Sequence, residues 1–109
     1  MNSSTYNSMT SPFLATIFEA STGHITAKDN ALLTEEDNST LVIYRYEFGY
    51  FIFVDVDIDL GQDTFTSLEA EGYSPELVKL IRRAIQHKCK FLQLDCDGAE
   101  YADLPTFIW

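Results

Sequence analysis

Several residue types and motifs are scarce in this chain of 109 residues, and each scarcity excludes a class of protein. Two cysteines are too few for a disulfide-built scaffold, and because no charged and apolar leader opens the sequence we expect a cytoplasmic protein. The longest apolar-rich run, residues 50–54, is far shorter than the ~20 residues that a membrane helix needs. No Gly-rich phosphate loop, GxSxG, HExxH or CxxC motif occurs, so we expect no enzyme and no cofactor.

Basic residues are scarce as well. Seven lysines and arginines stand against seventeen acids, which gives a formal charge of −10. This excess argues against binding of nucleic acid or an anionic membrane through the overall field, and a basic surface on another protein is its natural complement. The charge is also unevenly placed, because residues 75–90 hold five bases and one acid, a charge of +4, which leaves −14 on the remainder.

The length of the chain predicts one domain, and its 46% apolar residues are enough to build one core. We expect residues 1–11, rich in Ser, Thr and Asn, to be a flexible leader and residues 12–109 to form a single domain. The strongest local signal is a β-hairpin over about 41–58, since stretches of β-branched and aromatic residues flank Phe48 and Gly49.

Helix signals appear in three places. The sequence Ser-Pro-Glu at 74–76 supplies a cap, a proline in the first turn and an early acid, and it begins an amphipathic helix over about 75–87. Thr26 caps a shorter helix in which Asp29 supports the positive end. Residues 63–71 predict another short helix.

Three further segments complete the predicted fold. Residues 90–96 predict a strand, residues 13–20 fit a short strand or a helix, and residues 104–109 form a closing segment whose aromatic side chains dock on the core. Because strands and helices do not alternate regularly, the sequence predicts an α+β fold. It is a mostly antiparallel sheet with a central hairpin, packed by one main amphipathic helix and one or two short helices.

Four sequence elements together resemble a known family. They are STGHIT at 21–26, FIFV at 51–54, FLQLDCDG at 91–98 and LPTFIW at 104–109. The combination resembles a family of small uncharacterised proteobacterial proteins, a domain of unknown function met on plasmids, phages and integrated elements, over about residues 13–109. Gly23 and Ile108 differ from the alanine and the acid expected at those positions. The resemblance implies an accessory gene of a mobile element and supplies no catalytic residues.

Asp55, Asp57 and Asp59 form an acidic ladder, because they alternate with apolar residues and so place one carboxylate every ~6.6 Å along one strand face. A calcium loop is excluded, since Leu60 and Thr66 stand where that loop needs glycine and glutamate. A solvated strand face explains the ladder without any function.

Two functional interpretations use the acidic ladder. In the first, it meets Asp95 and Asp97 and holds Mg²⁺. In the second, it imitates DNA, and since DNA carries a phosphate about every 3.4 Å per strand, further acids must fill the gaps, with Glu100 and Asp103 among the candidates. The predicted partner-binding surface comprises Asp55, Asp57, Asp59, Asp95, Asp97, Glu47, Asp63, Glu69 and Glu71.

Other side chains have simpler interpretations. The basic face of the 75–87 helix, with Lys79, Arg82 and Arg83, lacks the interleaved aromatics of a nucleic-acid site. It is predicted to be a solvated face or a secondary interface that contacts the acidic face of a second copy. Cys89 is expected to be a buried small hydrophobe rather than a nucleophile paired with His24.

Seven aromatic residues are expected mostly in the core, although strand alternation puts some on the outer face of the sheet, where they would anchor an interface. They are Tyr44, Tyr46, Tyr50, Phe51, Phe53, Phe107 and Trp109.

The leading hypothesis is an acidic protein-binding inhibitor from a mobile element. It would block a nucleic-acid-binding host defence protein, of the anti-CRISPR or anti-restriction type, by presenting a DNA-like carboxylate surface. One alternative is a non-mimetic interaction protein, either a toxin–antitoxin partner or a homodimeric adaptor, that binds through aromatics and the basic helix. The third hypothesis is a metal-dependent phosphoryl-transfer enzyme.

Overall fold

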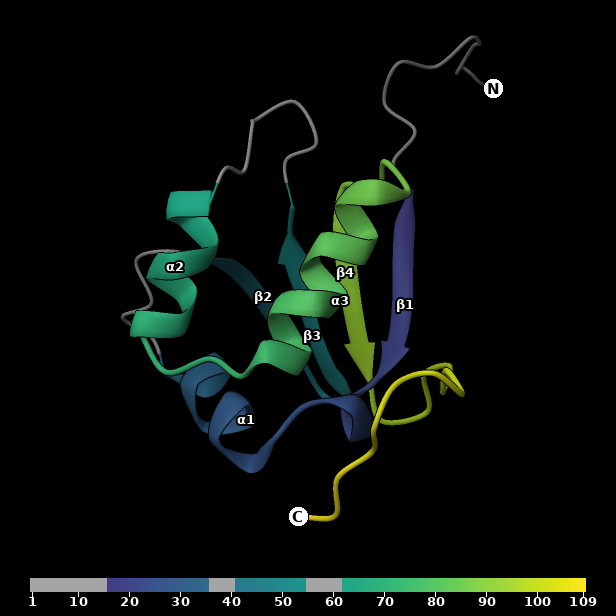
Figure 1. The fold of residues 1–109 in the computed structure, drawn as a ribbon. Coiled ribbons are helices and arrows are strands. Elements are labelled where there is room, and N and C mark those ends of the chain that lie inside the picture. Colours follow the sequence, from purple (N-terminus) through teal and green to yellow (C-terminus); the bar gives the residue numbers. More distant parts are fainter. Residues whose placement is uncertain (1–15, 36–40, 55–61) are drawn as a thin grey trace, which may run out of the picture.

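The computed structural model describes residues 16–35, 41–54 and 62–109, so the expected leader lies outside the described residues. Strands and helices form two layers, with the helices in front of the sheet in Figure 1. In chain order the elements are β1 (Ile17–Ser21), the 3-10 helix η1 (Thr22–His24), α1 (Ala27–Thr34), β2 (Val42–Tyr46), β3 (Gly49–Phe53), α2 (Gln62–Ala70), α3 (Pro75–Gln86) and β4 (Phe91–Asp95).

The four strands lie in the order β1-β4-β3-β2. β2 and β3 form the predicted hairpin, β3 and β4 are also antiparallel, and β1 runs parallel to β4. The α+β class with a mostly antiparallel sheet is therefore confirmed. Residues 13–20, which fit a strand or a helix on sequence alone, contain the start of the strand β1. β3 ends at Phe53, and the predicted continuation from Asp55 to Ile58 lies outside the described residues.

A two-residue turn at Glu47 and Phe48 connects the hairpin strands. Gly49 begins β3 opposite Asp95, and a Cβ atom at this position would lie 1.8 Å from the carbonyl oxygen of Leu94. Only glycine allows so close an approach of the two backbones. The glycine of the hairpin signal is thus required by the neighbouring strand β4.

One buried carboxylate joins the starts of two helices. Asp29 and Thr26 form a reciprocal capping box on α1, which confirms the predicted cap. Asp29 also accepts hydrogen bonds from the backbone N–H of Ser74 (2.8 Å) and from its hydroxyl (2.5 Å). Ser74 in turn caps α3 through the N–H of Leu77. The sequence predicts both caps, but the contact between them is a tertiary feature.

The core lies between the helices and the face of the sheet that they cover. α3 has the amphipathic pattern that the sequence predicts, and its buried side is turned to the sheet (Figure 1). Cys89 follows α3 and is buried, as expected, and this burial raises the pKa of its thiol. The largest fully buried apolar side chains are Ile25, Leu33, Ile52, Leu68, Leu77, Leu80, Ile81, Leu92 and Leu94.

His24 is buried and holds the C-terminal segment in place. The N–H of Tyr101 donates to His24 Nε2 (2.9 Å), so Nδ1 carries the proton and donates to the carbonyl oxygen of Pro105 (2.7 Å). Both ring nitrogens are therefore occupied by backbone groups. This arrangement excludes His24 as a base for Cys89.

The closing segment docks mainly through polar contacts. Trp109 Nε1 donates to the carbonyl oxygen of Ile25 (2.8 Å). The N–H of Phe107 donates to the carbonyl oxygen of Gly23 (2.7 Å). Leu104 is buried, whereas the Trp109 side chain stays 52% exposed. The expectation of aromatic docking is thus only partly correct.

Candidate functional site

The face of the sheet turned away from the helices is not covered by any strand or helix within the described ranges (Figure 1). We call it the open face. Strand alternation places every second side chain there, and the pairing register sets these side chains in three rows across β2, β3, β4 and β1. The rows are Val42–Phe53–Phe91–Ile17, Tyr44–Phe51–Gln93–Glu19 and Tyr46–Gly49–Asp95–Ser21.

Five aromatic rings form a continuous cluster on the open face. The ring of Phe91 lies 5.7 Å from that of Phe53, 6.3 Å from that of Phe51 and 6.4 Å from that of Tyr44, between centroids. Tyr46 extends the cluster at 5.1 Å from Phe51. Tyr44 is 57% exposed and the other four side chains are half-buried, so the cluster presents rings to solvent. We call these five residues the aromatic cluster.

The expectation that most of the aromatic side chains lie in the core is wrong. Of the seven that the sequence analysis assigns, Tyr50 alone is buried. It points to the covered side, where its hydroxyl contacts Asn30 Oδ1 (2.6 Å) and Thr34 Oγ1 (3.0 Å). The period-two pattern of the hairpin shows that Tyr50 lies on the opposite face from Phe51 and Phe53. It does not show which face the helices cover.

Two carboxylates flank the aromatic cluster on the open face. Asp95 accepts hydrogen bonds from the Tyr46 hydroxyl (2.5 Å) and from the N–H of Asp97 (2.8 Å), and these two bonds lower its pKa in that order. Burial, followed by the bond to Asp95, raises the pKa of Tyr46. Glu19 is exposed on β1, beside Gln93. The open face therefore carries permanent negative charge at neutral pH.

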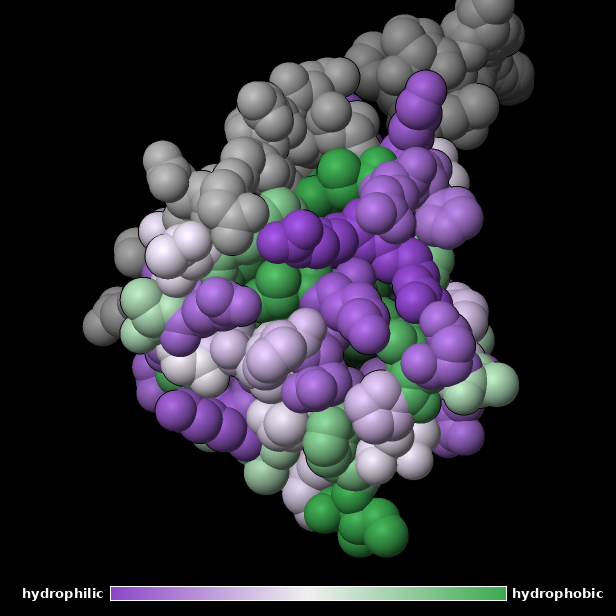
Figure 2. Space-filling model, in the orientation of Figure 1, coloured by the Kyte–Doolittle hydropathy of each residue, from purple (hydrophilic) through white to green (hydrophobic). Residues whose placement is uncertain are grey.

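None of the three rows contains a lysine or arginine. Arg45 belongs to β2 but points to the covered side, where its Nε donates to the carbonyl oxygen of Leu33 (2.7 Å). Basic side chains concentrate instead on and around α3, and Figure 2, which views the helix side, shows hydrophilic side chains over this region. The open face thus lies opposite the side of the molecule that carries α3 and its basic side chains.

The predicted secondary interface on α3 is partly engaged within the chain itself. The guanidinium of Arg82 lies 4.0 Å above the ring of Phe65. Arg83 forms a two-pronged ion pair with Asp103, with N–O distances of 2.7 and 3.3 Å. Lys79 is exposed. Asp103, considered above for DNA imitation, is accordingly neutralised by an arginine of α3.

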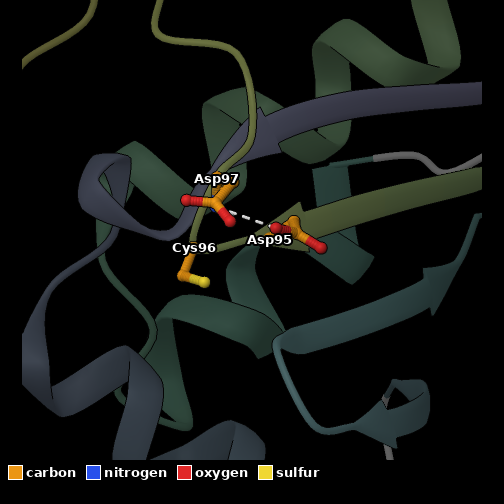
Figure 3. A group of neighbouring side chains, drawn as sticks. All are labelled: Asp95, Cys96 and Asp97. Carbon is orange, nitrogen blue, oxygen red and sulfur yellow. Dashed lines mark hydrogen bonds between the residues drawn. The ribbon is translucent and has the colours of Figure 1, made fainter.

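Asp95, Cys96 and Asp97 bring three potential ligand atoms within 4.8 Å of one another (Figure 3). Both oxygens of Asp95 already accept hydrogen bonds, one of them from the N–H of Asp97, and the side chains of Cys96 and Asp97 are exposed. Partial burial, then Asp97 and Asp95, raise the pKa of the Cys96 thiol. A hydrogen-bonded turn accounts for this grouping. The grouping therefore does not by itself indicate a Mg²⁺ site.

The predicted acidic surface is only partly visible. The acidic ladder of Asp55, Asp57 and Asp59 lies outside the described residues, and the side chain of Asp63, in α2, does so as well. Glu47, Asp95 and Asp97 lie together at the end of the sheet where the hairpin turns. Glu69 and Glu71 are exposed at the end of α2, in the helix layer, so the acids beyond the ladder do not form one surface.

A cavity of about 410 Å³ opens beside the hairpin turn, next to the open face. Tyr46 lines it and also belongs to the aromatic cluster. Phe48 and Trp109, each about half exposed, form part of its wall. The exposed apolar surface of the sheet therefore continues around the turn toward the C terminus.

Residues 17–109 match the family described as "Family of unknown function (DUF5983) C-terminal domain". The chain belongs to this family. The expectation of an uncharacterised family is confirmed, and the DUF5983 match begins at the first residue of β1 and includes every described element. No curated protein and no solved structure matches the chain. Among the described helices of this DUF5983 domain, none is long and apolar enough to cross a membrane.

Proposed function

We propose that this DUF5983 protein is a non-catalytic interaction protein that binds a positively charged surface of another protein through its open face. The observation that carries the proposal is the composition of that face. An aromatic cluster exposed to solvent is flanked by Asp95 and Glu19, and no lysine or arginine stands in its three rows.

Physical chemistry favours a protein partner for such a face. Contiguous apolar patches on soluble proteins mark interaction sites, and tyrosine and phenylalanine are enriched at interfaces. The two carboxylates select a cationic partner, because burying them against an apolar surface would leave their charge uncompensated. The formal charge of −10 adds attraction at long range.

The finer form of the proposal is an inhibitor carried by a mobile element, of proteobacterial origin, that occupies the nucleic-acid channel of a host defence protein of the anti-CRISPR or anti-restriction type. The family resemblance and the overall acidity support it. In this form Asp55, Asp57 and Asp59, which form the acidic ladder, would supply DNA-like charge in addition to the acids of the open face. Channels that bind nucleic acid are lined with arginine and lysine, which is the chemistry that the open face accepts.

The test begins with capture of host proteins on the full chain and continues with the purified candidate. Affinity is then measured at low and high salt for the unchanged protein, for a Tyr44→Ser/Phe51→Ser variant, and for a variant with Asn at 55, 57 and 59. The proposal predicts that the double serine variant loses at least about tenfold in affinity, since two interface aromatics are removed. Gln86→Ser at the end of α3, which is exposed and keeps the net charge, is the matched control.

The two variants separate the general proposal from its finer form. A loss of affinity in the asparagine variant, together with a steep fall of affinity in high salt, supports DNA imitation. Loss in the double serine variant alone supports an interaction protein without imitation. Unchanged binding in the double serine variant, with intact folding by circular dichroism, contradicts the use of the open face.

A further inference from the structure

Gln93 lies at the centre of the open face. Its neighbours in the same row are Phe51 on β3 and Glu19 on β1, and along β4 it lies between Phe91 and Asp95. Strand spacing places Glu19 and Asp95 about 8 Å apart between Cα atoms. Aromatic rings therefore stand on one side of Gln93 and carboxylates on the other.

The amide group of Gln93 has a defined orientation. Its Nε2 donates to the Tyr46 hydroxyl (2.9 Å), and that hydroxyl donates to Asp95. This chain fixes the amide nitrogen toward Tyr46, so Oε1 is the amide atom left to accept from outside. Within the described residues, no donor to Oε1 is found. The centre of the open face thus offers hydrogen-bond acceptors beside aromatic rings.

We propose that this centre binds the guanidinium group of an arginine from the partner, a step that rests on the proposed function. The guanidinium lies over Gln93, stacks on the ring of Phe51 or Phe91, and pairs with Asp95 and Glu19. Arginine suits the site because its planar group stacks on aromatic faces and donates to two acceptors at once.

Other occupants fit the same surface less well. A second copy of the chain would bring together two molecules that each carry a formal charge of −10, and the three rows of its open face offer no lysine or arginine to pair with Glu19 and Asp95. Nucleic-acid bases could stack on the rings, but no lysine or arginine of the three rows would meet their phosphates. A lysine ammonium would pair with the carboxylates without covering the rings as a plane.

The test uses two peptides of the same length, one alternating glycine with arginine and one alternating glycine with lysine. Each is titrated into the isotopically labelled full chain, and backbone amide shifts are followed by NMR. The expected shifts centre on Gln93 and its neighbours on β3 and β1. The arginine peptide should bind about threefold more tightly than the lysine peptide.

Four single variants locate the contacts. Phe51→Leu keeps apolar bulk but removes the ring, and Glu19→Gln keeps size but removes the charge, so each should weaken arginine-peptide binding about threefold. Phe48→Leu in the hairpin turn and Glu69→Gln on α2 are matched controls, since both are exposed residues away from Gln93, and neither should change the affinity. A thermal melt confirms that each variant folds.

Three results would overturn the inference. The first is amide shifts that avoid Gln93, and the second is the absence of any shift. The third is equal affinity for the two peptides together with no effect of Phe51→Leu on binding. The proposed function has its own readout, binding of the purified protein partner. If that partner still loses affinity with the Tyr44→Ser/Phe51→Ser variant while the peptides fail, the open face binds proteins by another chemistry and only the arginine assignment falls.

Discussion

The two faces of the sheet are built from neighbouring residues of the same strands, yet they differ in every physical respect. On the covered face Ile52, Leu92 and Leu94 are fully buried against the helices. On the open face Phe51 and Phe91 are half-buried and stand beside carboxylates. The covered face is apolar and closed, whereas the open face is aromatic, acidic and accessible.

The difference indicates what each face is for. Burial of the covered face supplies the hydrophobic stabilisation that a domain of this size needs, and its residues are aliphatic and close-packed. The rings of the open face lie against one another and stay half-buried or exposed, so their burial contributes less to folding than that of the covered face. An excess of exposed aromatics beyond the needs of folding is what an interaction surface requires.

The largest expected effect separates the two faces by mutation of adjacent residues. Leu92→Ala removes a fully buried side chain and should lower the free energy of unfolding by about 3 kcal/mol. Phe91→Ala removes a larger side chain from the open face but should cost less, about 2 kcal/mol, because this ring is only half-buried. Urea denaturation followed by circular dichroism measures both. Equal losses would show that the aromatic cluster is part of the core.

The next effect concerns Asp29, the buried carboxylate that joins the starts of α1 and α3. Asp29→Ala leaves the N–H groups of Thr26 and Ser74 without their acceptor and removes one half of the capping box of α1, so we expect a loss of about 3 kcal/mol in unfolding free energy. Asp29→Asn retains one acceptor oxygen but places an amide nitrogen near a donor, and should cost about 2 kcal/mol. A loss in Asp29→Ala no larger than that of Thr26→Ala, about 1 kcal/mol, would limit Asp29 to a local cap.

The sequence predicts the parts of the fold that have local causes. The Ser-Pro-Glu start of α3, the cap at Thr26 and the hairpin around Gly49 each depend on residues close in the chain, and the structure confirms all three. The contact of Asp29 with Ser74 and the burial of His24 depend on residues far apart in the sequence. A single buried histidine has no local pattern that would distinguish it.

The sequence predicts only part of the candidate site, for a similar reason. Alternation in β3 and β4 shows which side chains share a face, and the charge pattern identifies Asp95 as a candidate. Neither pattern tells which face the helices cover, because that depends on how α3 packs across the sheet. The partner of Asp95, the Tyr46 hydroxyl, comes from a strand that is not even its immediate neighbour in the sheet.

A smaller effect compares one carboxylate from each side of the molecule. In the folded state the Tyr46 hydroxyl and the Asp97 N–H lower the pKa of Asp95, and Arg83 lowers that of Asp103. Each group therefore stabilises the fold above its unfolded pKa, about 3.9, and loses this contribution as pH falls through its lower folded value. Thermal melts between pH 6 and pH 3, taken as roughly the range around these pKa values, should show a shallower acid decline for Asp95→Asn and for Asp103→Asn.

Salt distinguishes the two carboxylates. The partner of Asp103 is a charged guanidinium at the surface, so high salt should reduce the difference between Asp103→Asn and the unchanged protein. The principal partner of Asp95 is a neutral hydroxyl, and its contribution should persist in salt. The same salt response in both variants would contradict the assignment of these partners.

The smallest effect concerns the two cysteines, which report on the covered and accessible parts of the molecule. At neutral pH, iodoacetamide should modify exposed Cys96 well before buried Cys89, since the reagent must reach the sulfur and burial also raises the pKa of Cys89. Asp97→Asn should speed the reaction at Cys96 by less than about threefold. Its carboxylate is the second cause, after partial burial, of the raised pKa of that thiol, so its removal increases the thiolate fraction. Mass spectrometry of the labelled chain resolves both sites, and equal rates at Cys89 and Cys96 in the folded protein would mean that the covered side opens as readily as the end of β4.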